Sequence, residues 1–259
     1  MMRCASVRVI VAATLAVLAA LACSEVGTDP SIPVAIQLSP SPLPSIVVGD
    51  SMRDSTGVAV PLQATVFNFR NEVIPDAPIR FLALDSAKRF SVDSTTGFVV
   101  ANDTGQATVV ATSLTLQSAP ITLISVVRPG TMLALDSLRD SLDYAFTGRD
   151  TLRTFRVRVV QISGTDTIAV PSYLVRYAFV YPAGLDNTDS TAVQLVDDTQ
   201  RPSLADTTDA TGTANRSLRI TPDTRAFSDS VVVQVTATEP NGTAVPGSPI
   251  RYVLRVHIE

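Results

Sequence analysis

The sequence lacks most of the side chains on which enzymes and metal sites depend. Among its 259 residues there is no tryptophan, one histidine, His257, and two cysteines, Cys4 and Cys23. A single histidine cannot supply the ligands of a zinc site or complete a triad. The sequence therefore predicts a protein that is not an enzyme and has no cofactor and no metal site. His257 is then a residue of the last strand rather than a ligand or a base.

Long apolar runs are also missing, except at the N-terminus. Arg3 and Arg8 precede an apolar run from Val9 to Ala22. A basic head followed by such a run is typical of a secretory signal peptide, and the run is short for a transmembrane helix. We interpret residues 1–22 as a signal peptide helix. Losing Arg3 and Arg8 takes the formal net charge from −4 to −6, which gives no electrostatic reason to bind nucleic acid.

The residues at the end of the apolar run carry a second signal. Leu21-Ala22-Cys23 resembles the lipobox of bacterial lipoproteins, although Ala20 stands where leucine is usual. The resemblance implies that Cys23 is lipidated, that a polar tether spans 23–33, and that the protein is attached through lipid to the bacterial cell envelope. Ser24 favours the outer membrane. If Cys23 is instead a small residue of an ordinary signal peptide, the protein is secreted.

The rest of the chain has the pattern of short strands. Valine, threonine and isoleucine dominate, and turn-forming residues interrupt them at short intervals. Apolar and polar residues alternate over Leu62–Phe67 and over Thr154–Val160, which is typical of strands with one buried face. We predict an all-β fold with a first domain over 34–128, a linker over 129–133 and a second domain over 134–259. We expect Met132–Tyr144 to be an opening strand followed by a loop, with a helical turn as the alternative.

The first domain resembles the bacterial immunoglobulin-like domains of group 2. The residues that match are Val48-Gly49-Asp50, the segment from Val92 to Ala101, and the segment from Gly105 to Ala111. The resemblance covers about residues 34–127 and implies a β-sandwich. Phe81 lies near the position at which the family often has tryptophan.

The second domain resembles the invasin/intimin-type, group 1, immunoglobulin-like domains over a shorter motif. The matching fragment is Thr208–Ala214, followed by the strand through Ile220 and by Val233–Ala237. The segment Asp136–Asp150 has no counterpart in that pattern. Together the two resemblances imply two tandem immunoglobulin-like β-sandwiches. Such domains serve as spacers, stalks and binding modules, so no catalytic residue carries over.

Two further groups of residues are candidates for binding. Tyr173, Tyr177 and Tyr181 would share one face of a strand with Val175 and Phe179. That face is either an aromatic platform for sugars or a partner protein, or part of the core. Carboxylates also gather in loops, where they would bind calcium or remain solvated charges: Asp136, Asp140, Asp143, Asp150, Asp186, Asp189, Asp197, Asp198, Asp206 and Asp209.

These observations favour a non-catalytic lipoprotein of the cell envelope that acts as an interaction or spacer module. The alternative is a carbohydrate-binding or cell-adhesion module. The partner would be a protein or a polysaccharide, which the sequence does not identify.

Overall fold

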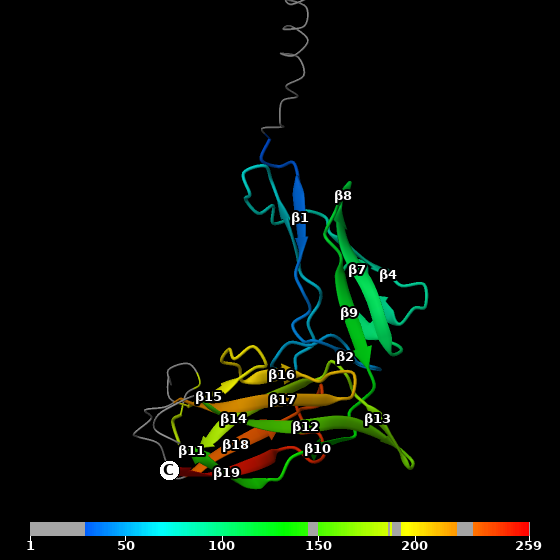
Figure 1. Cartoon of the computed structure of the whole chain (residues 1–259). Coiled ribbons are helices and arrows are strands. Elements are labelled where there is room, and N and C mark those ends of the chain that lie inside the picture. Colours follow the sequence, from blue (N-terminus) through cyan, green and yellow to red (C-terminus); the bar gives the residue numbers. More distant parts are fainter. Residues whose placement is uncertain (1–28, 145–149, 186, 188–192, 222–229, 259) are drawn as a thin grey trace, which may run out of the picture.

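The computed structural model describes residues 29–144, 150–185, 187, 193–221 and 230–258. Every regular element in these ranges is a β-strand, as the sequence predicts. No helix among the described residues is long and apolar enough to cross a membrane. Figure 1 shows two β-sandwiches in an L, with the first standing upright on one end of the second.

The first sandwich contains nine short strands. They are β1 (Ala35–Leu38), β2 (Ile46–Val47), β3 (Ala64–Phe67), β4 (Arg80–Leu84), β5 (Phe90–Val92), β6 (Val99–Ala101), β7 (Gly105–Ser113), β8 (Leu116–Gln117) and β9 (Ile121–Val126). One sheet has the order β2-β9-β7-β4, with β8 beside β7. The pairs β1-β3 and β5-β6 form the opposite layer. β2 runs parallel to β9, and the other pairs are antiparallel.

The core of the first sandwich follows the alternation in the sequence. Leu62 and Val66 are buried while Gln63 between them is exposed. Phe81 is buried in the same cluster. A Cβ at Gly97 would lie 2.9 Å from the Phe81 ring, and Gly97 has a φ of 75°. The turn before β6 therefore needs glycine both for its backbone and for its contact with the core aromatic residue.

The second sandwich has longer strands. They are β10 (Thr131–Ala134), β11 (Arg139–Tyr144), β12 (Thr151–Ser163), β13 (Asp166–Ala169), β14 (Leu174–Tyr181), β15 (Val193–Val196), β16 (Ala205–Thr207), β17 (Thr213–Ile220), β18 (Ser230–Thr236) and β19 (Ile250–Ile258). The two sheets have the orders β10-β12-β17-β15, with β13 beside β12, and β11-β19-β18-β14-β16.

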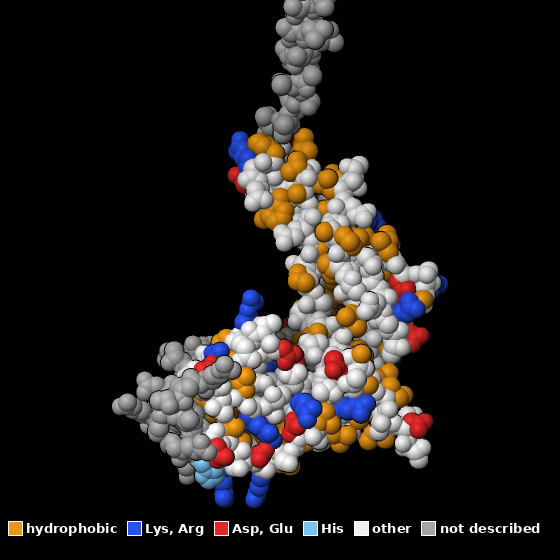
Figure 2. Space-filling model, viewed as in Figure 1, with side chains coloured by type: hydrophobic (Ala, Val, Ile, Leu, Met, Phe, Trp, Pro, Cys, Tyr) orange, Lys and Arg blue, Asp and Glu red, His pale blue; other side chains and the backbone are white. Residues whose placement is uncertain are grey.

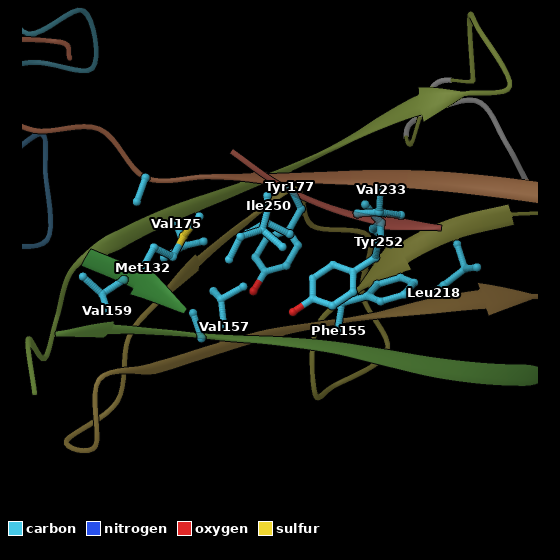
Figure 3. Packing of buried hydrophobic residues seen from close by; sticks show 14 of the residues in the cluster. Met132, Phe155, Val157, Val159, Val175, Tyr177, Leu218, Val233, Ile250 and Tyr252 are labelled. Atoms are coloured by element: carbon cyan, nitrogen blue, oxygen red, sulfur yellow. The ribbon is translucent and has the colours of Figure 1, made fainter. Parts of the chain in front are cut away.

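The strand order of the second sandwich is that of an immunoglobulin domain. Strands A, B, E and D of that fold form one sheet, and strands C, F and G form the other. Here β10, β12, β17 and β15 occupy the first set, and β14, β18 and β19 the second. β11 runs parallel to β19, as β2 does to β9 in the first sandwich. The second core joins the two sheets, and Figure 3 shows Phe155 and Tyr252 meeting across it.

Two segments near the boundary differ from the sequence prediction. β10 begins at Thr131, so most of the segment assigned to the linker, 129–133, pairs with β12. Met132 is buried there in the second core. Residues 139–144 were predicted to lie in a loop, and this prediction was wrong because they form β11. Its pairing partner, β19, is at the other end of the domain sequence, so no local pattern could indicate the strand.

The two cores are joined at the boundary. Val47 and Val126 come from the first sandwich, yet both are buried in the apolar cluster of the second. Ile124 and Val127 pack against the same cluster. The junction is therefore an apolar contact continuous with a core, which restricts relative motion of the domains more than a polar interface would.

Candidate functional site

A groove lies at the junction of the two sandwiches. Its volume is about 300 Å³. The first sandwich contributes residues 43–47 and the loop 51–57, and the second contributes the start of β14 and the turn 238–242. A groove between domains is a common position for a ligand site. Whether this groove could hold a ligand depends on the charged side chains that line it.

Arg53 and Glu239, two of the charged residues that line the groove, are in ion pairs, whereas Arg176 is exposed. Arg53 donates from Nη2 to Asp50 Oδ1 at 2.8 Å and from Nη1 to the Gly57 carbonyl oxygen at 2.7 Å. Glu239 accepts from Nη1 of Arg128 at 3.0 Å, and this ion pair crosses the domain boundary. Because Arg53 and Glu239 already have ion-pair partners, neither offers a free charge to a ligand. The groove therefore has the features of a contact between domains.

The loop 51–57 also approaches the second sandwich closely. A Cβ at Gly57 would lie 3.2 Å from the carbonyl oxygen of Pro240, and Gly57 has a φ of 85°. The Tyr173 hydroxyl donates to the carbonyl oxygen of Thr238 at 2.6 Å and so fixes the neighbouring turn. The two sides of the groove therefore approach each other closely at Gly57 and Pro240, and one ion pair, Arg128–Glu239, joins the two domains.

Tyr173, just before β14, and Tyr177 and Tyr181 within β14 do not form an exposed row. Tyr173 and Tyr177 are 5% and 2% exposed and lie in the core, while Tyr181 is 45% exposed. The pairing of β14 with β18 shifts register between Phe179 and Tyr181, and such a bulge turns later side chains to a different face. The core interpretation therefore applies to Tyr173 and Tyr177. Burial raises the pKa of both phenols, which keeps them neutral.

Tyr252 is an aromatic core residue that the sequence analysis did not single out. Its ring stacks on Phe155 with 5.1 Å between centroids (Figure 3). Its hydroxyl donates to the carbonyl oxygen of Arg156 at 2.5 Å, and burial raises its pKa to about 12. The alternation of apolar residues along Tyr252–Val256 was a usable signal for this burial.

Several acidic residues of the second domain are engaged in ion pairs. Asp136 accepts from Arg156 Nη2 at 2.7 Å, and the Arg153 guanidinium pairs with Asp140. Burial by itself raises the pKa of Asp136, but the hydrogen bond and charge of Arg156 hold that pKa below its ordinary value. Asp150 lies 3.8 Å from Arg219 Nε. These carboxylates are neutralised by arginine.

Other acidic residues shape turns. Asp197 and Asp209 each accept hydrogen bonds from backbone amides two and four residues further on. Within the described ranges, no group of three or more His, Cys, Asp or Glu side chains converges on a point where a metal ion could bind. Asp186 and Asp189 lie outside the described residues.

Arg216 is a buried charge that the sequence analysis missed. It is 7% exposed and points inward from β17 between Ala214 and Leu218. Its Nη1 lies 3.2 Å from Asp206 Oδ1 and 2.8 Å from the Asn215 carbonyl oxygen. The sequence did contain a signal for this burial. Arg216 is two residues from an apolar residue on either side, so it shares their face of the strand. Its role is to close the sandwich where β16 and β17 meet.

His257 is exposed on β19 and does not line the groove. Cys23 lies outside the described residues.

Comparisons with known proteins give resemblance in fold without a family. No family model matches the sequence, and no curated protein matches it. Among solved structures, the Yersinia pseudotuberculosis adhesin InvE aligns at 14% identity and a TM-score of 0.33, over 85% of this chain and 58% of that one. Domains 4 and 5 of the S-layer protein SbsC align at 13% identity and 0.30, over 86% and 98%. The fibronectin(III)-like modules of Clostridium thermocellum CbhA align at 13% and 0.31, over 86% and 95%.

These neighbours are immunoglobulin-like and fibronectin-III-like domains. At such identities and TM-scores they carry no conclusion about function. The fold assignment rests on the strand order of the chain itself.

Proposed function

We propose that the chain is a non-catalytic, lipid-anchored module of the bacterial cell envelope that holds its second sandwich away from the membrane. One observation carries the proposal. The described chain begins, ahead of β1, at the end of the first sandwich opposite the second (Figure 1), and the lipobox-like Leu21-Ala22-Cys23 comes shortly before this point in the sequence. Lipid on Cys23 would therefore leave the second sandwich as the distal part.

The junction supports a spacer role. An apolar cluster, the Arg128–Glu239 ion pair and the close approach of Gly57 to Pro240 all connect the domains. A spacer must transmit orientation as well as distance, and a fixed joint does so where a flexible linker would not. The groove is then the surface boundary of this contact between the two domains.

The finer assignments belong to the same proposal. We assign the first sandwich to the group 2 type and the second to the invasin/intimin type of bacterial immunoglobulin-like domain. Gly97 and Gly212 support this, since both stand in the quoted motifs and both have positive φ. We place the protein at the outer membrane on the basis of Ser24.

Metabolic labelling with an alkyne palmitate analogue tests the anchor. The full chain, with its N-terminal segment, is expressed in a bacterial host, and labelled protein is followed through membrane fractionation. We expect the wild-type chain to be labelled and Cys23→Ala to lose the label. Cys4→Ala is the matched control, since Cys4 is the other cysteine of the sequence. It should remain labelled, because it keeps Cys23. An unlabelled wild type, or a labelled Cys23→Ala chain, would overturn the proposal.

A further inference from the structure

The outward side of the sheet β11-β19-β18-β14 carries arginines that have no acidic partner. Along β19, Tyr252, Leu254 and Val256 are buried, so Arg251 and Arg255 point outward with Val253 between them. Arg139 of β11 is paired with Val253 in the register. We call Arg139, Arg251 and Arg255 the arginine face. All three are exposed.

The pairing register sets the spacing of these charges. Alternate residues of a strand are about 7 Å apart and neighbouring strands about 5 Å apart. Arg139 therefore lies diagonally between Arg251 and Arg255. Like charges so close together destabilise a sheet unless something neutralises them.

Four other arginines of the second sandwich do have acidic partners, and Figure 2 shows basic and acidic side chains intermingled on one face of it. Ion pairs join Arg153 to Asp140, Arg156 to Asp136, Arg216 to Asp206 and Arg219 to Asp150. Within the described ranges, none of the three arginines of the arginine face has a carboxylate within ion-pair distance. One carboxylate, Asp143, stands on this side of the sheet, opposite His257 at the far end. The arginine face is thus a concentration of unbalanced positive charge on an acidic protein.

Neutral hydrogen-bonding groups lie between the arginines. Gln234 of β18 is paired with Arg251 and accepts from its Nε at 3.0 Å, which holds that guanidinium in place. Ser141 is paired with Arg255. A shallow hollow at the centre of the arginine face is lined by Arg139, Asp140, Ser141, Val253, Arg255 and His257. The carboxylate of Asp140 is already paired with Arg153.

The same side of the sheet continues to the junction. Arg176 of β14 is exposed and, with Thr236 beside it, lines the groove. Positive charge therefore recurs along the strands from the groove to the far tip. A row of this kind suits an extended chain with repeated negative charges better than a small ligand.

We propose that the arginine face binds an acidic polysaccharide, with carboxylates held by the guanidinium groups and hydroxyls held by Gln234 and Ser141. A guanidinium group matches a carboxylate in two-point geometry. The outward residues of β18 and β19 include no Phe or Tyr, and Tyr181 of β14 is a single exposed ring, whereas single-stranded nucleic acid stacks successive bases on several rings. The anchored end lies at the opposite pole of the molecule, which disfavours the protein's own membrane as the occupant.

The test measures binding of alginate, a polymer of uronic acids, to the full chain in an uncharged detergent. Dextran is the neutral polymer, and a single-stranded oligonucleotide and phosphatidylglycerol vesicles are the competing anions. The double variant Arg251→Gln/Arg255→Gln removes two charges from the arginine face. Arg80→Gln/Arg201→Gln removes two exposed charges that lie outside the arginine face. Equal urea midpoints show that the variants are folded.

We expect the wild type to bind alginate and not dextran, and to bind more weakly as salt increases. The arginine-face variant should lose affinity by at least about tenfold, and the matched variant by less than about threefold. Absence of alginate binding would overturn the inference, as would equal losses in the two variants. Equal or tighter binding of the oligonucleotide or the vesicles would also overturn it, by assigning the arginine face to another class of partner.

This inference deepens the proposed surface role, and only its argument against the protein's own membrane rests on the proposed anchor. Palmitate labelling tests Cys23, and alginate binding tests arginines of the second sandwich. A failure of either experiment leaves the other proposal standing.

Discussion

Single glycines of this chain do two different things, and the structure separates them. Gly164 has a φ of 62° and open space where a Cβ would be. Gly212 has a φ of 78°, and a Cβ there would lie 2.5 Å from the Val159 carbonyl oxygen. The first glycine satisfies a turn. Gly212 provides the positive φ of a turn and also lets two strands pass close to each other. Val159 N donates to the Gly212 carbonyl oxygen at 2.8 Å.

The pair makes a prediction at this scale. Gly164→Ala should lower the free energy of unfolding of the second domain by about 1 kcal/mol, the cost of a left-handed backbone. Gly212→Ala should cost about 2 kcal/mol more, since a backbone oxygen cannot retreat from the added methyl group without disturbing β12. Urea denaturation followed by tyrosine fluorescence measures this, because the five tyrosines all lie in the second domain. Equal costs for the two variants would refute the close-approach argument.

At the scale of elements, one turn recurs in both sandwiches. In Asp54-x-Thr56, Asp197-x-Thr199 and Asp209-x-Thr211, the aspartate accepts from the threonine amide and hydroxyl. It also accepts from the amide four residues on. The residue between the threonine and that last amide has a positive φ, as Gln200 and Gly212 do. A carboxylate thus replaces the backbone partners that a tight turn leaves without hydrogen bonds.

These turns give the fold a defined acid sensitivity. The pKa of Asp209 is lowered from its ordinary value of 3.8, chiefly by the Thr211 hydroxyl. The pKa of Asp54 is lowered by the Thr56 hydroxyl, and that of Asp197 by the Arg201 amide. Because the folded values are depressed, the stabilisation is present above the unfolded pKa and is lost as pH falls through the folded pKa.

We expect the urea midpoint to fall between about pH 5 and about pH 2, and Asp209→Asn to reduce the size of that fall in the second domain. Asparagine keeps the acceptor oxygen, as Asn241 does for the Thr243 amide and hydroxyl, but it does not titrate. Asp166→Asn is the control, since Asp166 is exposed and forms no side-chain hydrogen bond within the described ranges. An unchanged pH dependence in Asp209→Asn would contradict this account.

The strands show how far sequence alone could go. Alternation predicted β3, β12 and the strands around Ile220 and Val233, because in them one face is buried along the whole length. β11 was not predicted, because this segment forms a strand only through its parallel pairing with the distant β19. The face of Tyr181 was mispredicted because a register shift breaks the period of two. Period-based reasoning fails where pairing is non-local or irregular.

The arrangement of the whole molecule was the least predictable level. Val47 and Val126 look like ordinary core residues of the first domain, and the sequence does not indicate that they are buried in the cluster of the second. For the same reason the junction groove could not be predicted, since its sides come from segments far apart in the chain. The arginine face could not be predicted either, because it depends on which arginines are paired with acids.

The joint yields the prediction that matters most for a spacer. Val127 follows β9 and packs on the second core without belonging to a strand. Val127→Asp places a charge in this apolar contact, which is unfavourable without a partner, while leaving the ladder of each sandwich intact. Small-angle scattering should then show a larger radius of gyration and a broader distance distribution than the wild type. Val34→Asp, at an exposed site, should not change the scattering. If Val127→Asp scatters like the wild type while both domains stay folded, the apolar junction is not what fixes the bend, and the ion pair Arg128–Glu239 and the Gly57–Pro240 contact would have to hold it alone.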